Sequence, residues 1–269
     1  MGITISFGLQ KGGVGKTTVT AVTSWLLAEQ GHRVLAVDFD SQGNLTQFLT
    51  RSSPYEFLHR TIFEACKEHD PRPYIHQVTN KLHLLPAEDF LSGFSRYLYN
   101  EYKPTLGNDV DRNALNVVLR ETLEIVRDSY DFVLVDLPPN LGEQTINGMA
   151  ASDFCVVILQ GEPFSFDALE RYLETLEAVQ RSVSPGMRLA GILTGIQDAR
   201  TAMGQFILEQ ARQQYEELVF DTVIRRKARI VEFSFEGVQN RTRMDREAIE
   251  QYERFVKELL NRVKSRSFP

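Results

Sequence analysis

The order of apolar and polar residues predicts buried strands that alternate with amphipathic helices. Short runs rich in Val, Ile and Leu, bounded by polar or turn-forming residues, have the length and composition of strands covered on both faces. Such strands are expected at 3–8, 33–38, 131–136, 154–159 and 188–194, with a further short strand at 82–86. Helical periodicity is found at 17–30, 112–127, 166–182, 202–216 and 246–266.

This alternation indicates the fold class. Consecutive strands joined by helices pair in parallel, and right-handed crossovers leave few topologies. We therefore predict an α/β fold with a doubly wound, mostly parallel sheet and helices on both faces. No repeat or Pro/Gly/Ser-rich linker interrupts the chain, so residues 1–269 are expected to form one domain. Segment 51–110 is interpreted as insertions on that domain, and 246–266 as the helix that closes it.

Composition narrows the class of protein. The 269 residues are 42% hydrophobic and 25% charged, which excludes collagen-like, mucin-like and wholly disordered chains. The two cysteines, Cys66 and Cys155, have no CxxC spacing, so no disulfide framework, structural zinc or iron–sulfur cluster is expected. No signal peptide and no apolar stretch long enough to span a bilayer is recognised. These features predict a cytoplasmic protein without a membrane segment.

The segment KGGVGKTT (11–18) lies between the first predicted strand and helix, where phosphate groups are commonly bound. Its glycines allow backbone N–H groups to surround an anion, and the helix N-terminus adds its positive dipole end. Lys16 is expected to reach phosphate oxygens, and the Thr17 hydroxyl to coordinate Mg²⁺. The expected phosphate-binding residues are Gly12, Gly13, Val14, Gly15, Lys16, Thr17 and Thr18.

The loop departs from the common pattern G-x-x-x-x-G-K-[ST]. Gln10 occupies the position of the first glycine, and Lys11 follows it. In this deviant Walker A form, the loop resembles that of the ParA/MinD family of dimeric ATPases. The resemblance implies P-loop NTPase chemistry with ATP and Mg²⁺, in an ATP-dependent homodimer. It also implies that Lys11 reaches the phosphates of the opposite subunit, as an arginine finger does. The alternative is a surface lysine beside the loop.

Two further segments resemble boxes of that family. VDFDSQGNLT (37–46) is similar to its V-D-x-D-P-Q-G-N box, and YDFVLVDLPPNLG (130–142) to a Walker B strand followed by D-x-P-P. The resemblance assigns Asp40 to the attacking water, Asp38 to Mg²⁺ and the switch region, and Asp136 to Mg²⁺. The alternative is that these acids cap helices. The expected catalytic residues are thus Lys11, Lys16 and Asp40, and the expected metal ligands Thr17, Asp38 and Asp136.

The net charge of −6 conceals a basic C-terminal end, since 221–269 holds 12 Lys and Arg against 8 Asp and Glu. VIRRKARIVEFSFEG (223–237) resembles the family's I-P-R-N-x-R-L-x-E-A-P stretch, with Arg and Lys in place of Pro and Asn. The resemblance implies that this stretch lies near the adenine and contacts DNA, and DART (198–201) resembles another family element. The expected DNA-binding residues are Arg200, Arg225, Arg226, Lys227 and Arg229. They would contact phosphates rather than read bases. The alternative is a solvated or partner-facing strip.

Together these features resemble a ParA-type ATPase for segregation of a plasmid or chromosome. The resemblance implies that the Mg-ATP dimer binds non-specific double-stranded DNA. Weak hydrolysis, stimulated by a ParB-like partner, would release it, and the protein would be nucleoid-associated. One alternative is a MinD-like membrane-cycling ATPase, but the acidic residues within 246–266 and the Q-G-N of the second box argue against it. The other is a ParA-like ATPase that positions protein cargo.

Overall fold

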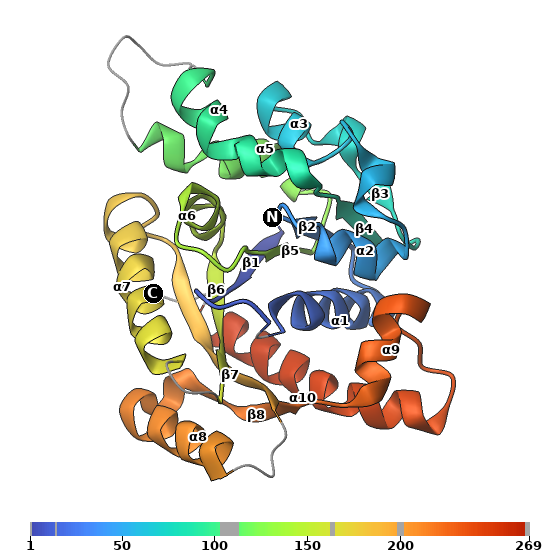
Figure 1. The fold of residues 1–269 in the computed structure, drawn as a ribbon, viewed down its shortest axis with the longest axis vertical. Coiled ribbons are helices and arrows are strands. Elements are labelled where there is room, and N and C mark those ends of the chain that lie inside the picture. The colour runs from blue at the N-terminus through green and yellow to red at the C-terminus, as the bar shows by residue number, and fades with distance from the viewer. Residues whose placement is uncertain (1, 14, 103–112, 162–164, 198–201, 267–269) are drawn as a thin grey trace.

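The described part of the chain contains an eight-stranded sheet. The computed structural model describes residues 2–13, 15–102, 113–161, 165–197 and 202–266. The strand order is β3-β4-β2-β5-β1-β6-β7-β8 (Figure 1). The strands are β1 (Ile3–Gly8), β2 (Val34–Asp38), β3 (His76–Gln77), β4 (Leu82–Leu85), β5 (Phe132–Asp136), β6 (Phe154–Gln160), β7 (Arg188–Gln197) and β8 (Val219–Arg225). β3 pairs antiparallel with β4, and the other pairings are parallel.

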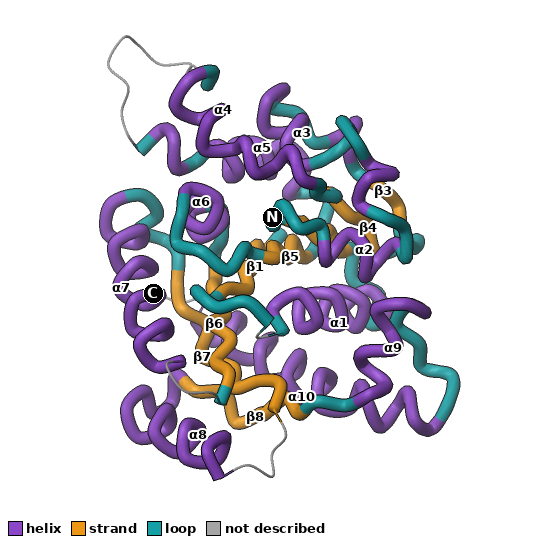
Figure 2. The backbone as a smooth tube through the Cα atoms, in the orientation of Figure 1, coloured by secondary structure: helices purple, strands orange, loops and turns teal. Residues whose placement is uncertain are grey.

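Helices cover both faces of this sheet (Figure 2). They are α1 (Lys16–Glu29), α2 (Asn44–Thr50), α3 (Ile62–Glu68), α4 (Phe94–Asn100), α5 (Val118–Arg127), α6 (Glu143–Ala150), α7 (Ser165–Ser182), α8 (Ala202–Tyr215), α9 (Ala228–Glu236) and α10 (Arg243–Arg266). α1 and α10 pack on each other and on one face, and α6, α7 and α8 contact strands from the other. The predicted doubly wound α/β fold is confirmed.

The predicted strands agree with the observed ones to within a few residues, and two elements of the C-terminal part were not predicted. β8 was missed because its apolar run is broken by the exposed Asp221 and the half-buried Thr222, as is usual for an edge strand. α9 was missed because the basic run before it carries no helical periodicity. Within the segment 51–110, β4 pairs with β2 inside the main sheet, while α3 and α4 pack on α5 and α6.

The last helix closes the face of the sheet that α1 also covers. Its apolar residues lie at helical spacing and face β8 and α1. Tyr252, Phe255 and Leu259 are each no more than 1% exposed. Across the residues that the structure describes, no helix combines the length and apolar character needed to cross a bilayer. The apolar side of α10 is therefore occupied by the protein's own core.

Removing a ring from this contact tests the role of α10. Phe255→Ala is expected to lower the free energy of unfolding by about 3–5 kcal/mol, because the surrounding core cannot fill the cavity. Glu253→Ala, on the exposed side of the same helix, is the matched control and should change it by less than about 0.5 kcal/mol. Urea unfolding measures both. Equal effects of the two substitutions would show that α10 is not packed as described.

Candidate functional site

The loop between β1 and α1 has a backbone that only glycine adopts readily. Gly13 and Gly15 have φ angles of 73° and 87°, in the left-handed region that is strained for other residues. A Cβ atom added to Gly12 or Gly13 would meet no atom within 4 Å. Gly15 caps α1 without any side-chain cap, so the first turn presents its N–H groups as anion-binding helix termini do. Val14 lies outside the described residues.

Lys16 begins α1 and folds back over this loop. Its Nζ atom donates a hydrogen bond to the Lys11 carbonyl oxygen at 2.9 Å, and the residue is only 6% exposed. Burial lowers the pKa of Lys16, while the carboxylates of Asp136 and Asp40 act in the opposite direction. A buried cation therefore lies beside the glycine loop, with carboxylates close enough to affect its pKa.

Asp136 lies beside a further carboxylate, Asp38, because the ends of β2 and β5 are in register. Asp38 and Asp136 are directly paired residues, and both are almost fully buried. The Thr17 hydroxyl donates to Asp136 Oδ2 at 2.6 Å, and the Thr20 hydroxyl to Oδ1 at 3.3 Å. Burial raises the pKa of Asp136 to about 7. Burial and then repulsion from Asp136 raise the pKa of Asp38 to about 8.

Asp38 also anchors the segment that follows β2. The backbone N–H and the hydroxyl of Thr46, in α2, each donate to Asp38 Oδ2 at 2.7 Å. The same hydroxyl accepts the Ala87 N–H at 2.9 Å, which links α2 to the loop after β4. The motif alone predicts no role for Thr46, since only the fold shows that its hydroxyl reaches back to Asp38. Asp40 accepts the Gln42 N–H at 3.1 Å.

These groups surround a cavity of about 660 Å³, within the size range of small-molecule sites. One side is formed by the glycine loop, by Lys16, Thr17 and Thr18, and by Asp40. The segment 225–227 and α9 line the same cavity. The expected phosphate-binding residues that the structure describes therefore share a cavity with three of the expected DNA-binding residues.

The segment 225–227 turns from β8 into α9 and is held by α10. The Arg225 N–H donates to Gln251 Oε1 at 2.9 Å, and its carbonyl accepts the Gln251 amide at 2.8 Å. The side chains of Arg225 and Arg226 are exposed. The Lys227 ammonium group donates to the Glu247 carbonyl oxygen. Two exposed guanidinium groups thus stand on a rigid backbone beside the cavity.

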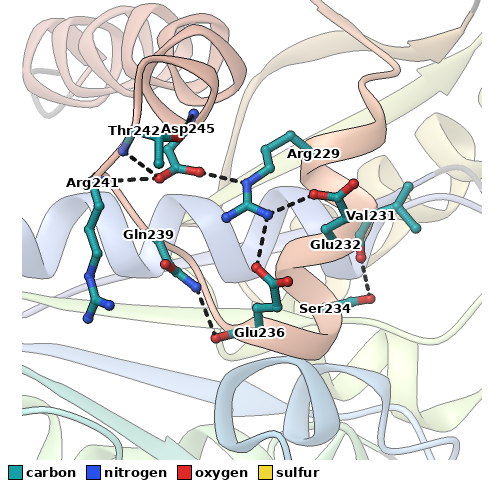
Figure 3. A network of polar contacts seen from close by, with 9 residues as sticks. All are labelled: Arg229, Val231, Glu232, Ser234, Glu236, Gln239, Arg241, Thr242 and Asp245. Carbon is teal, nitrogen blue, oxygen red and sulfur yellow. Dashed lines mark hydrogen bonds and ion pairs between the residues drawn. The ribbon is translucent and has the colours of Figure 1, made fainter.

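The remaining two expected DNA-binding residues differ from this pair. Arg200 lies outside the described residues. Arg229 is only 17% exposed and makes ion pairs with Asp245, Glu232 and Glu236, at 2.6, 2.7 and 2.9 Å (Figure 3). Its guanidinium group is therefore bound within the protein, which a sequence without the positions of Asp245 and Glu236 could not reveal.

The doubly wound sheet, the glycine loop at the start of α1 and the paired acids at the ends of β2 and β5 define a P-loop NTPase of the deviant Walker A class. Residues 2–189 match a family model described as an AAA domain. The chain is 33% identical over 241 residues to the chromosome-partitioning ATPase Soj of Treponema pallidum, covering 88% of each chain. It is 36% identical over 228 residues to Soj of Thermus thermophilus, covering 85% of this chain and 83% of the relative.

A solved structure extends the similarity to three dimensions. The cobyrinic acid a,c-diamide synthase of Mycobacterium smegmatis, solved with a bound ATP analog and magnesium, has a TM-score of 0.82 to this protein. It is 28% identical, and the match covers 98% of this chain and 96% of that one. The chain belongs to the ParA/Soj family of partition ATPases, and the family predicted from its motifs is confirmed.

The raised pKa values of Asp38 and Asp136 predict a pH-dependent stability of the nucleotide-free protein. An aspartate in the unfolded chain titrates at roughly 3.9, so the folded state holds its protons more tightly. The contribution of these two carboxyl groups to the free energy of unfolding therefore falls as the pH rises from about 4 to about 8, above which it is constant. In Asp38→Asn one of the two carboxyl groups can no longer ionise. The free energy of unfolding of this variant should therefore rise relative to that of the wild type as the pH increases from 5 to 8.

Urea unfolding at several pH values measures this difference. Asp221→Asn, which removes an exposed carboxylate on β8, is the control and should follow the wild-type pH dependence. If Asp38→Asn followed it as well, the Asp38 carboxyl would not be perturbed in the folded protein.

Proposed function

We propose that this protein is a ParA-type ATPase that takes part in the segregation of plasmid or chromosomal DNA. In this proposal Mg-ATP binds in the cavity and drives formation of a homodimer, which binds double-stranded DNA without sequence preference. Hydrolysis, weak alone and stimulated by a ParB-like partner, then releases the DNA. The observation that carries the proposal is the shared cavity, which both the phosphate loop and the basic segment 225–227 line.

The residues on the phosphate side fit ATP and Mg²⁺. Backbone N–H groups and the Lys16 ammonium suit phosphate oxygens, which bind strongly to charged donors. The Thr17 hydroxyl and the Asp136 carboxylate, joined by a hydrogen bond of 2.6 Å, offer the hard oxygen ligands that Mg²⁺ prefers. When bound, the ion would neutralise charge that develops on the phosphates. The Asp38 carboxylate accepts a hydrogen bond from Thr46 in α2. Through this bond, a change of the bound nucleotide would affect α2, which belongs to the proposed switch region.

Two further residues complete the proposed catalytic set. Asp40 lines the cavity and would orient the attacking water for in-line displacement. Lys11 lies at the start of the loop and would supply positive charge to the site of the opposite subunit. This division makes hydrolysis depend on the dimer, because one subunit alone lacks the second lysine.

The proposed DNA contacts are the exposed Arg225 and Arg226 together with Lys227, and Arg200 extends the set. Such cations bind phosphates independently of base sequence. Since this segment also lines the cavity, its arrangement can respond to the nucleotide. We further propose that residues 1–269 act as one domain and that the protein is a cytoplasmic, nucleoid-associated one. The apolar face of α10 packs on the sheet, which argues against a lipid-bound terminal helix as in MinD-like proteins.

Substitution of the two loop lysines separates binding from hydrolysis. Lys16→Ala should weaken ATP affinity roughly 10- to 100-fold, because a charged hydrogen bond is lost. Lys11→Ala should leave ATP affinity within about threefold of wild type but lower kcat by roughly 10³-fold, the scale of an arginine finger. The variant should also fail to form an ATP-dependent dimer.

Nucleotide titration, steady-state hydrolysis and analytical ultracentrifugation measure these three properties. Lys81→Ala, in the turn before β4, is the control and should match the wild type in each. A Lys11→Ala protein that dimerised with ATP and hydrolysed it at the wild-type rate would contradict the trans role.

Salt dependence tests the DNA interface. In the presence of ATP, the logarithm of the binding constant for a random duplex should fall linearly with the logarithm of salt concentration. The double variant Arg225→Gln/Arg226→Gln should reduce that slope by about 2, one unit for each lost phosphate contact. Lys257→Gln/Lys264→Gln removes the same charge from α10 and should retain the slope. Wild-type protein that binds no DNA with ATP, or equal losses in both variants, would contradict this interface.

A further inference from the structure

The segment between β2 and α2 forms a loop whose two ends are joined by a side chain. Asp38 is the last residue of β2, and Thr46 lies in the first turn of α2, eight residues further on. The Thr46 N–H and hydroxyl both donate to Asp38 Oδ2 at 2.7 Å. Between these two ends, Asp40, Gln42 and Asn44 line the cavity. Two hydrogen bonds to one oxygen atom therefore close a loop that forms part of the cavity wall.

The direction of the Thr46 hydroxyl is fixed by a second segment. The hydroxyl oxygen accepts the N–H of Ala87, in the loop after β4, at 2.9 Å. Because Ala87 is itself a donor, the single hydroxyl proton is left for the Asp38 carboxylate. Thr46 and Ala87 are both 0% exposed, so water cannot replace either bond. A buried N–H or carboxylate oxygen that loses its partner is costly, and both bonds are therefore retained.

Asp40 depends on the closure of this loop. Its N–H donates to Asp38 Oδ1 at 3.3 Å, and its own carboxylate accepts the Gln42 N–H at 3.1 Å. The Asp40 carbonyl oxygen accepts the Gly43 N–H at 3.0 Å. The two oxygens of Asp38 thus hold the loop at Asp40 and at Thr46. A shift of the Asp38 carboxylate would move the Asp40 side chain with it.

The middle of the loop is also closely packed. Gly43 has a φ angle of 63°, in the left-handed region. A Cβ atom at this position would lie 2.6 Å from Pro54 Cγ and 2.9 Å from the Ala87 carbonyl oxygen. The loop is therefore packed against the same residue whose N–H orients the Thr46 hydroxyl.

We propose that Thr46 is a positioning residue for ATP hydrolysis. Its hydroxyl holds the loop between Asp38 and α2, so that the Asp40 carboxylate keeps its place in the cavity. The inference rests on the proposed function, in which Asp40 orients the attacking water. The glycine loop and Lys16 belong to another segment of the chain. Loss of the hydroxyl therefore affects the hydrolysis step more than the binding of ATP.

Thr46→Val removes the hydroxyl and keeps the shape of the side chain. The kcat per nucleotide-binding site should fall roughly 10- to 100-fold, because a small misplacement of a catalytic group has effects of this size. The dissociation constant of ATP should stay within about twofold of the wild-type value. Calorimetric titration gives the affinity and the number of binding sites, and steady-state phosphate release gives the rate. Division by the number of sites removes the effect of a smaller folded fraction.

Two further variants control for the rest of the side chain and of the helix. Thr46→Ser keeps the hydroxyl and should retain a kcat within about twofold of wild type. Thr50→Val makes the same exchange one turn later in α2, where the hydroxyl donates to the Thr46 carbonyl oxygen and accepts the Ser52 N–H. Its kcat and its ATP affinity should equal those of the wild type.

Hydrogen exchange of the nucleotide-free protein tests the positioning without hydrolysis. In Thr46→Val the Ala87 N–H loses its acceptor, and the loop 39–45 loses one of the bonds that close it. The amides of the loop and of Ala87 should exchange roughly tenfold faster than in the wild type, the effect of one lost hydrogen bond. Thr50→Val should leave both unchanged. Mass spectrometry of peptides that cover the two segments measures the exchange.

Several results would overturn the proposal. A Thr46→Val protein with the wild-type kcat per site, or with unchanged exchange of the loop, would show that the hydroxyl does not hold Asp40. An equal loss of kcat in Thr46→Ser or in Thr50→Val would assign the effect to the packing of α2. Wild-type protein that binds ATP without hydrolysing it would contradict the proposed function. Faster exchange of the loop in Thr46→Val would then still support the positioning role, and unchanged exchange would contradict it.

Discussion

The paired ends of β2 and β5 are the constraint on which the site depends. Their register places Asp38 and Asp136 side by side in a buried position, where both pKa values are raised. Two such carboxylates are costly unless hydroxyls or cations compensate them. Thr17 and Thr46 do so in part, and each belongs to a different helix. The start of α1 and helix α2 are thereby fixed to the same pair of strands.

The cavity brings the phosphate loop and the acid at the end of the second box together with residues from the C-terminal part of the chain. It is lined by the glycine loop with Lys16, Thr17 and Thr18, and also by the turn 225–227 and α9. α9 also packs on α2, the helix anchored by Asp38. Direct contacts through α2 and α9 thus connect the carboxylates to the basic segment 225–227. Such a path suits a protein in which nucleotide state governs binding of a second ligand.

The protein with this arrangement belongs to the ParA/Soj family. In the proposed function Arg225 and Arg226, which line the cavity, act on DNA, whereas Arg229 is paired with three carboxylates. Neighbouring cations of the same stretch thus have different surroundings because their carboxylate neighbours differ. Charge composition cannot express that difference, since Glu232, Glu236 and Asp245 contribute to net charge in the same way wherever their partners lie.

The sequence alone determined the parallel α/β fold, the phosphate loop and the strand-end acids. These follow from local periodicity and from glycines and a lysine within eight residues, so short-range rules suffice. Edge strand β8 escaped prediction because exposed residues interrupt its apolar run, and helix α9 because it is short and follows a basic run. Only the tertiary structure decided that Thr46 binds Asp38, that segment 225–227 lines the same cavity as the phosphate loop, and that Arg229 is paired with Asp245. Each of these depends on register and helix packing between distant segments, and pattern along the chain does not encode which side chains a fold brings within hydrogen-bonding distance.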